Sequence, residues 1–325
     1  MEKLQNKLTK IAGDASFRQF YRLKKGKKTS IIVKAKKEKF KNLVLYSAIN
    51  KFLRQRKILA PKLINFFFYK GVIEIEDFGD VQFSQYIKGK KNKLKAYKKA
   101  VKFLIKIQKI KPQKTINLLK PYKIKLDYYD VSNLHKESDL FFNWYLVGIL
   151  GSKKGKNFKN LIRKELDKIY KKIYFKNSYF VHRDFHISNL MLIKGKIGIL
   201  DSQDAIIGNP IYDLVSLVDD VRIRTSISLK EKIFNFYLSK TSKNLNKKVK
   251  QLKNDFNILS IQRNLKILGI FYRLFKRDKK KHYLKFMPYT WKLIEVRLRD
   301  DMFKNLKLLL NKAVSKKQRT RVVFR

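Results

Sequence analysis

The sequence of 325 residues contains no cysteine and comparatively few acidic residues. Without cysteine the chain can form no disulfide bond, no thiolate zinc site and no cysteine nucleophile. A reducing compartment is compatible with that composition. Lysine and arginine number 79 against 25 aspartates and glutamates, so the formal net charge is +54.

The sequence also lacks a long apolar run. The longest one, around residues 141–150, is interrupted by Asn143 and is about half as long as the ~20 residues that a membrane span needs. The first ten residues are polar and lack the apolar core and small-residue cleavage site of a secretory signal. We therefore expect a soluble, cytoplasmic protein without a membrane span.

The large positive charge has two possible explanations. It could mark a protein that binds RNA or an anionic membrane surface, because such charge attracts phosphates. It could also reflect a low-GC genome, since lysine, asparagine, isoleucine, phenylalanine and tyrosine have AT-rich codons. Lysine is spread over almost every segment, and arginine, the better bidentate phosphate ligand, is far scarcer. The dispersed pattern favours the codon explanation, and we expect no specific nucleic-acid partner.

The length and the 44% content of hydrophobic residues fit two lobes, each with its own core. Residues 1–76 predict a β-rich lobe with one helix, and residues 77–80 predict a hinge. Residues 81–314 predict a mainly helical lobe, and 315–325 a frayed basic tail. In the first lobe we expect strands at 16–23, 29–35, 63–68 and 72–75 and a helix at 43–56. In the second we expect helices near 94–110, 137–150, 157–173, 211–221, 229–241, 249–277 and 288–314, with a hairpin within 180–200.

One segment of the second lobe carries residues suited to phosphoryl transfer. Asp184 follows a short apolar strand, Asn189 comes five residues later, and Asp201 follows the apolar residues at the end of the predicted hairpin. Phosphoryl transfer requires an aligned acceptor hydroxyl and metal ions that neutralise the phosphates. The pattern predicts Asp184 as the base, with Asn189 and Asp201 as oxygen ligands of Mg²⁺.

The same residues have a purely structural interpretation. His182, Arg183 and Asp184 could form a surface ion-pair triplet, and Asp201 could simply start a turn. The joint spacing of the two acids and the amide makes that interpretation much less plausible. His182 and His186 are not required by the chemistry, so we expect them to brace the loop.

At this point the chain resembles the aminoglycoside phosphotransferases and choline kinases. The resemblance is closest to one branch, the bacterial N-acetylmuramate and N-acetylglucosamine anomeric kinases of cell-wall recycling. It extends from residue 11 to about 292. It implies a protein-kinase-like bilobal α+β fold, the cofactors ATP and magnesium, and an enzyme that converts an amino sugar to its 1-phosphate; we also expect a monomer. The blocks that carry it are Gly13–Arg18, Leu140–Tyr145, Asp201–Ala205, Pro210–Leu217 and Gln262–Phe271.

The resemblance also suggests residues for the nucleotide. Ser16 would approach the phosphates from the turn that opens the first hairpin. Lys34 lies where kinase-like folds place a phosphate-binding lysine, although the following helix, 43–56, has no glutamate to pair with it. Glu76 and Phe78 would offer backbone groups to the adenine edge.

The acceptor site is suggested less directly. Trp144 could stack on a sugar ring, but an aromatic residue in such an apolar helical run could equally belong to the core. Glu137 could bind hydroxyl groups, and Gln203, Asp204 and Arg263 are further candidates. Two alternatives remain open: another small-molecule kinase, of aminoglycoside, choline or homoserine, and a catalytically idle RNA-binding protein with the same fold.

Overall fold

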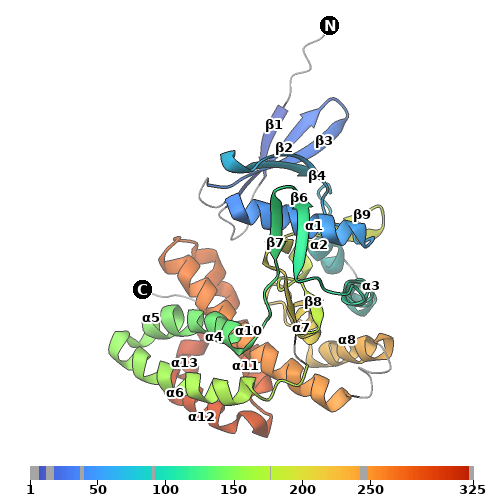
Figure 1. Cartoon of the computed structure of the whole chain (residues 1–325). Helices are drawn as coiled ribbons and strands as arrows, with labels where there is room; N and C mark the ends of the chain where they lie inside the picture. The colour runs from blue at the N-terminus through green and yellow to red at the C-terminus, as the bar shows by residue number, and fades with distance from the viewer. Residues whose placement is uncertain are drawn as a thin grey trace. The chain divides into compact units, whose positions relative to one another are not determined.

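The computed structural model of the chain describes residues 7–11, 18–36, 40–89, 92–175, 177–241 and 248–321 (Figure 1). The chain divides into two compact units. The first comprises Met1–Asp127 with Tyr179–Ile207, and the second Tyr128–Ser178 with Gly208–Arg325. The five-stranded sheet belongs to the first unit and the longest helices belong to the second. This arrangement agrees with the predicted α+β class.

A five-stranded antiparallel sheet forms one part of the first unit, with the strand order β1-β2-β3-β5-β4. Alternate residues of β3 and β5, among them Val33 and Ile73, are buried on one face of this sheet. Helix α1 contacts β4 and β5 and buries Ala48, Ile49 and Phe52. The predicted hairpin, helix and later strands are confirmed. The strands are β1 (Lys7–Ile11), β2 (Gln19–Lys25), β3 (Lys28–Lys34), β4 (Leu63–Phe67) and β5 (Val72–Glu76), and the helix is α1 (Phe40–Gln55).

The rest of the first unit consists of helices and short hairpins. Helix α3 buries Tyr97, Val101 and Leu104 along one face, while most of its lysines lie on the exposed face. Its amphipathic spacing explains why the helix forms here. The elements are α2 (Phe83–Lys88), α3 (Lys93–Gln108), β6 (Thr115–Leu119), β7 (Tyr122–Lys125), β8 (Tyr179–Val181), β9 (Leu190–Ile193), β10 (Lys196–Ile199) and β11 (Ile206–Gly208), and the one-turn 3₁₀ helices are η2 (Phe68–Lys70), η4 (Ile187–Asn189) and η5 (Ser202–Asp204).

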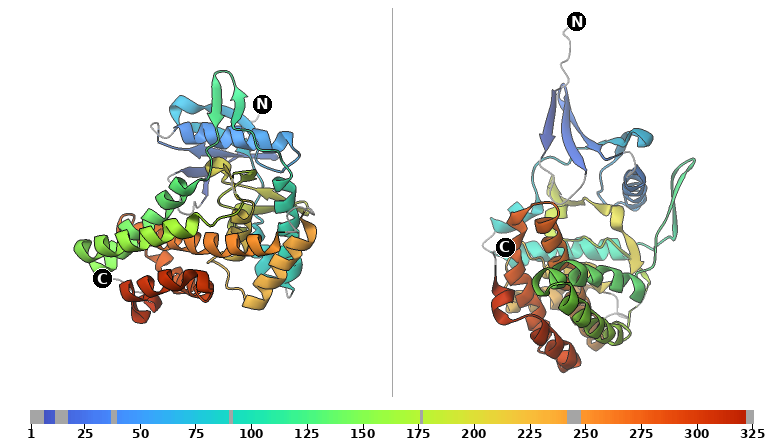
Figure 2. Two further views of the ribbon diagram at one scale, coloured as in Figure 1. Left: turned by 60° about the horizontal axis from the view of Figure 1, so that its bottom comes forward. Right: turned by 90° about the vertical axis from the view of Figure 1, so that its left-hand side faces the viewer.

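The second unit is helical and is organised around α10, a helix of 28 residues (Figure 2). Gly269 of α10 lies so close to the backbone of Leu140 and Phe141 that a Cβ atom would come within 2.5 Å of it. This contact joins α10 to η3, a π-helix. The elements are α4 (Val131–Leu140), η3 (Phe141–Leu146), α5 (Val147–Leu150), α6 (Ser152–Tyr170), α7 (Ile211–Val218), α8 (Ile227–Lys240), α10 (Val249–Lys276), η6 (Lys281–Phe286), α11 (Met287–Arg297), η7 (Asp301–Phe303), α12 (Lys304–Ala313) and α13 (Lys316–Thr320).

Two predictions for the end of the chain were wrong. The helix predicted over 288–314 is two helices, α11 and α12, because the side chain of Asp300 accepts a hydrogen bond from Met302 N and starts the turn η7. The start of the tail is not frayed. Ser315 and Gln318 form a capping box for α13, and buried Arg319 pairs with Glu295 at 2.9 Å.

In the described ranges, no helix combines the length and the apolar character needed to cross a membrane. The division of the chain into lobes at residues 77–80 stays a prediction.

Candidate active site

The loop after β8 turns sharply at Arg183, which has a φ of +69°. His186 N donates to the carbonyl of Asp184 at 2.9 Å, and Asn189 N donates to the carbonyl of His186 at 3.0 Å. These two bonds fold residues 184–189 into a compact loop that ends in η4. The spacing of five residues therefore returns Asn189 to Asp184.

The side chain of Asn189 is oriented by this loop. Its Nδ2 donates to the backbone carbonyl of Asp184 at 3.0 Å and lies 3.4 Å from Asp184 Oδ2. The amide oxygen, Oδ1, has no hydrogen-bond partner in the described part of the chain. Asp184 keeps 46% of its side-chain surface exposed, and its Oδ1 lies 3.4 Å from His186 Nε2. The loop thus presents one carboxylate and one amide oxygen to an incoming ligand.

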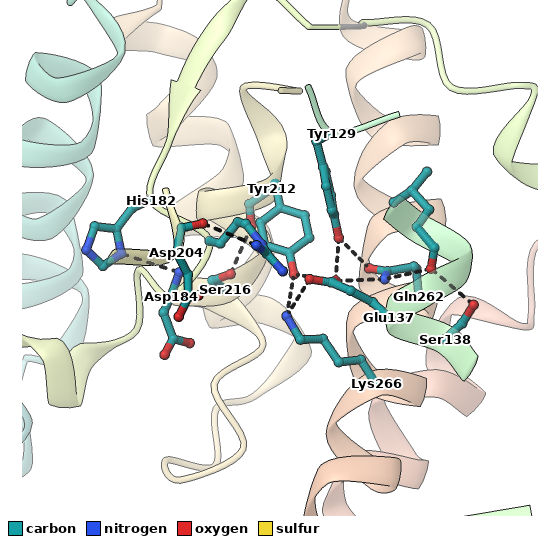
Figure 3. Close-up of polar contacts among 12 residues, drawn as sticks. Tyr129, Glu137, Ser138, His182, Asp184, Asp204, Tyr212, Ser216, Gln262 and Lys266 are labelled. Carbon is teal, nitrogen blue, oxygen red and sulfur yellow. Dashed lines mark hydrogen bonds and ion pairs between the residues drawn. The ribbon is translucent and has the colours of Figure 1, made fainter. Parts of the chain in front are cut away.

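His182 lies fully buried at the start of the loop. The backbone N–H of Asp184 donates to its Nδ1 at 3.3 Å (Figure 3). Burial lowers the pKa of His182 to about 4, although the charge of Asp184 acts to raise it. The imidazole is therefore neutral near pH 7 and holds the backbone of Asp184 through a hydrogen bond.

The hairpin of β9 and β10 connects Asn189 to Asp201. Leu190 pairs with Ile199, and Leu200 N donates to the carbonyl of Asn189 at 2.9 Å. Because the strands are antiparallel, the residue before β9 and the residues after β10 lie at the same end of the hairpin. The predicted hairpin is confirmed, with its turn at Lys194 and Gly195. The structure therefore brings Asp184, Asn189 and Asp201 together.

Asp201 has a left-handed backbone, with φ 60° and ψ 42°. Its Oδ1 accepts a hydrogen bond from Arg18 Nη2 at 2.6 Å, and its Oδ2 has no partner among the described residues. Burial raises the pKa of the Asp201 carboxyl, while the charge of Arg18 acts to lower it. One oxygen of this carboxylate is held by the protein and the other remains available.

Arg18 forms an ion pair with Asp201, and the sequence did not predict it as a site residue. Its Nη1 donates to Gln203 Oε1 at 3.1 Å, and the guanidinium lies 5.5 Å from the ring centre of Tyr46 and 5.6 Å from that of Phe20. Burial raises the pKa of Tyr46 to about 12, so this ring is neutral. The scarcity of arginine among so many lysines is the signal that could have identified Arg18.

Helix α1 anchors the turn that follows Asp201. Ser202 Oγ donates to Asn50 Oδ1 at 2.6 Å, and both residues are buried. Gln203 Nε2 donates to Asp204 Oδ2 at 3.1 Å. Two of the predicted acceptor residues, Gln203 and Asp204, are thus adjacent to the predicted metal ligand.

The predicted hinge is held by arginines. Glu76 Oε2 accepts from Arg54 at 2.8 Å, so this side chain is engaged. Asp77 is partly buried, which acts to raise its pKa, but hydrogen bonds from Arg22 and Gly79 hold the pKa below its ordinary value. Phe78 packs on Gly198, where a Cβ atom would lie 2.8 Å from the ring. The backbone N–H and C=O of Phe78 make no hydrogen bond within the described residues.

Among the described residues, Lys34 makes no contact with this cluster. Its side chain is exposed, and its Nζ lies 5.3 Å from the ring centre of Tyr21. Ser16, the other residue predicted for the phosphates, lies outside the described residues.

In the second unit, Glu137 lies at the centre of a buried polar network (Figure 3). Its Oε1 accepts from Lys266 Nζ at 2.7 Å. Its Oε2 accepts from the hydroxyl groups of Tyr129 and Tyr212 and from Gln262 Nε2. Both oxygens are engaged, so the carboxylate that was predicted to bind an acceptor hydroxyl is occupied by the protein itself.

Two further residues predicted for the acceptor lie elsewhere in the second unit. Trp144 is half-buried in η3 and has no ring or hydrogen-bond partner among the described residues, whereas its neighbours Phe141, Phe142 and Tyr145 form the core. Arg263 of α10 is 5% exposed, and its Nη1 is buried with no hydrogen-bond partner in the ranges that the structure describes.

Comparison with known proteins gives a consistent result. The family model described as the phosphotransferase enzyme family matches residues 7–245. An N-acetylmuramate/N-acetylglucosamine kinase of Neisseria meningitidis is 26% identical over 288 residues, which cover 86% of this chain and 82% of that protein. A kinase of the same name from Pseudomonas aeruginosa is 26% identical over 294 residues, covering 89% of this chain and 82% of that protein.

Solved structures show the same fold at lower sequence identity. An ADP-bound aminoglycoside phosphotransferase, APH(2'')-Ib, has a TM-score of 0.60 at 13% identity, covering 93% of this chain and 95% of that one. A choline/ethanolamine kinase family protein from Mesorhizobium loti has a TM-score of 0.61 at 10% identity, covering 96% of this chain and 94% of that one. The predicted kinase-like fold is confirmed.

Proposed function

Because the chain belongs to the phosphotransferase enzyme family, we propose that it is a kinase that uses ATP and magnesium to phosphorylate an amino sugar. The proposed acceptor is the anomeric hydroxyl of N-acetylmuramate or N-acetylglucosamine, and the product is the 1-phosphate. The names of the relatives from Neisseria meningitidis and Pseudomonas aeruginosa support this acceptor. The resemblance noted from the sequence supports the anomeric position.

One observation carries the proposal for the chemistry. The hairpin of β9 and β10 places Asn189 and Asp201 at the same end, and each has one side-chain oxygen without a partner among the described residues. Oxygen donors of this kind fit Mg²⁺, which prefers carboxylate and carbonyl ligands and keeps several waters. We propose that these two residues hold the metal, which neutralises the phosphate charge when it is bound.

The roles of the chain's other residues follow from their positions. Asp184 is exposed enough to contact an acceptor hydroxyl, to orient it and to take up its proton. The backbone groups of Phe78 are available to the adenine edge, and Ser16 is proposed to approach the phosphates. Among the acceptor candidates, Trp144 retains exposed surface for stacking on a pyranose ring.

Glu137 is the exception among the proposed acceptor residues. Since both of its oxygens are engaged, we propose that it shapes the helical unit and does not bind the sugar directly. Gln203, Asp204 and Arg263 remain candidates for hydroxyl or carboxylate groups of the acceptor.

A panel of acceptors tests this function. The purified chain is incubated with ATP and magnesium and with N-acetylmuramate, N-acetylglucosamine, an aminoglycoside or choline, and the products are analysed by ³¹P and ¹H NMR. The expected product is an amino-sugar 1-phosphate, identified by coupling between phosphorus and the anomeric proton. Phosphorylation of another hydroxyl would contradict the anomeric assignment. Turnover of choline or an aminoglycoside alone would contradict the acceptor class.

A further inference from the structure

The cation that contacts Asp201 is Arg18, whereas a kinase-like fold would predict Lys34 as the cation of the phosphate site. In protein kinases a lysine of the third strand binds the nucleotide phosphates. Here Lys34 ends β3, where it pairs with Gln19 of β2, whereas the preceding residue, Val33, pairs with Phe20. Successive residues of a strand point to opposite faces. Lys34 therefore lies on the face opposite to that of Val33 and Phe20.

Arg18 lies close to Phe20, on the face of the sheet opposite to Lys34. Its guanidinium lies 5.6 Å from the ring centre of Phe20, and the side chain is 4% exposed. The two arms of the guanidinium bind two different residues, Asp201 at 2.6 Å and Gln203 at 3.1 Å. The fork of donors in an arginine fits this double contact, and the single ammonium of a lysine does not.

We propose that Arg18 is a positioning residue of the metal site, which holds one oxygen of Asp201 so that the other is available to magnesium. This inference rests on the proposed function, because it concerns the metal that accompanies the nucleotide.

Three features of the structure support this role. Asp201 has a left-handed backbone just after β10, and among the described residues its side chain is held by Arg18. Arg18 binds both Asp201 and Gln203, and so fixes the turn at two points. Burying a charged guanidinium is costly unless it is paired, and the pair with Asp201 offsets that cost.

Metal-dependent nucleotide binding tests the inference. Binding of a non-hydrolysable ATP analogue to the full chain is measured by calorimetry during a MgCl₂ titration and in excess EDTA. The variants are Arg18→Gln, Arg18→Lys and the matched control Lys34→Gln. Loss of a residue that orients a metal ligand typically costs about 10–100-fold in metal affinity. In Arg18→Gln we expect the magnesium concentration for half-maximal binding to rise by at least ~10-fold.

The other variants and conditions make the result specific. Arg18→Lys keeps the charge but loses the double contact, so we expect a rise of about threefold. Lys34→Gln should stay within about twofold of the wild type, and nucleotide binding in EDTA should be the same in every variant. When Asp201→Asn is already present, Arg18→Gln should cause no further change, because the two residues act together.

Several results would overturn the inference. One is a wild-type magnesium titration in Arg18→Gln, and another is a larger effect of Lys34→Gln. An equal loss of binding in EDTA would mean that Arg18 contacts the nucleotide itself. If Arg18→Gln does not fold, as judged by circular dichroism, the titration of Arg18→Lys decides the question in the same way. If the wild type itself shows no magnesium-dependent binding, the proposed function fails together with this inference. If the wild type binds with magnesium and Arg18→Gln is unaffected, only this inference fails.

Discussion

The carboxylates of Asp201 and Glu137 each bind a basic side chain, but they differ in how many of their oxygens the protein already occupies. Asp201 accepts from Arg18 through Oδ1, and its Oδ2 has no partner among the described residues. Both oxygens of Glu137 accept hydrogen bonds, from donors that include Tyr129, Tyr212, Gln262 and Lys266. A ligand can use the free oxygen of the first, whereas it could bind the second only by displacing a protein donor. Both residues were predicted from the sequence as functional, and the hydrogen bonds distinguish them.

The largest expected effect concerns Asp184, beside the carboxylate with the free oxygen. Asp184→Asn should lower turnover by about 10²–10⁴-fold, because a general base contributes roughly that factor. Nucleotide affinity should stay within about twofold, since the proposed metal ligands are unchanged. Steady-state kinetics and calorimetry measure the two quantities, and Glu231→Gln on the exposed surface of α8 is the control. Unchanged turnover would remove Asp184 from the mechanism.

Asp201→Asn tests the free oxygen directly. Asparagine accepts the left-handed backbone of this position, so the turn should persist while the negative charge is lost. We expect the magnesium requirement for nucleotide binding to rise by at least ~10-fold. Binding is measured by a metal titration at constant nucleotide. A wild-type titration curve would contradict the assignment of Asp201 as a ligand.

Glu137→Gln tests the fully engaged carboxylate. Removing one partner of a buried ion pair leaves Lys266 without a counter-charge, which should lower the free energy of unfolding by about 3 kcal/mol. The KM for the acceptor, measured on the folded enzyme, should change less than about twofold. Urea unfolding and kinetics provide the two values. A large rise in KM with unchanged stability would show that Glu137 binds substrate, and the contrast with Asp201 would disappear.

The smallest expected effect, taken per pH unit, is the change in stability with pH due to His182, which supports the loop of Asp184. Because burial lowers its pKa from 6.5 to about 4, the unfolded chain binds more protons than the folded one between these values. Stability should therefore fall as the pH drops from about 6.5 towards 4, by up to ~1.4 kcal/mol per pH unit from this group. His182→Asn should reduce this slope in urea unfolding, and the exposed His282→Asn should not. Equal slopes in all three proteins would contradict the burial of a neutral His182.

The sequence predicted the loop and hairpin of the site well because their geometry is local. Asn189 follows Asp184 by five residues, and two short apolar strands come next. These local features determine where Asp201 lies. The alternation of Ile31 and Val33 could also have shown that Lys34 belongs to the opposite face of β3.

The interactions that distinguish the carboxylate of Asp201 from that of Glu137 are not local in sequence. Arg18, the residue before β2, is far from Asp201 in the sequence, and no periodicity predicts that pairing. The donors of Glu137 come from the segment before α4 and from α7 and α10, so only the packed helices reveal that its oxygens are engaged. The local spacing of residues thus predicted which side chains could bind a ligand. The tertiary contacts determine which of their oxygen atoms can do so.

The left-handed backbone at Asp201 has a consequence for evolution within the family. Aspartate, asparagine and glycine adopt this conformation more readily than other residues. A descendant that loses the proposed metal ligand therefore keeps the turn most readily by changing to asparagine or glycine. At the aligned position of a related sequence, either residue would indicate a chain that keeps the turn but has a weakened or missing metal ligand, whereas a bulky or β-branched residue would indicate that the turn itself has been rebuilt.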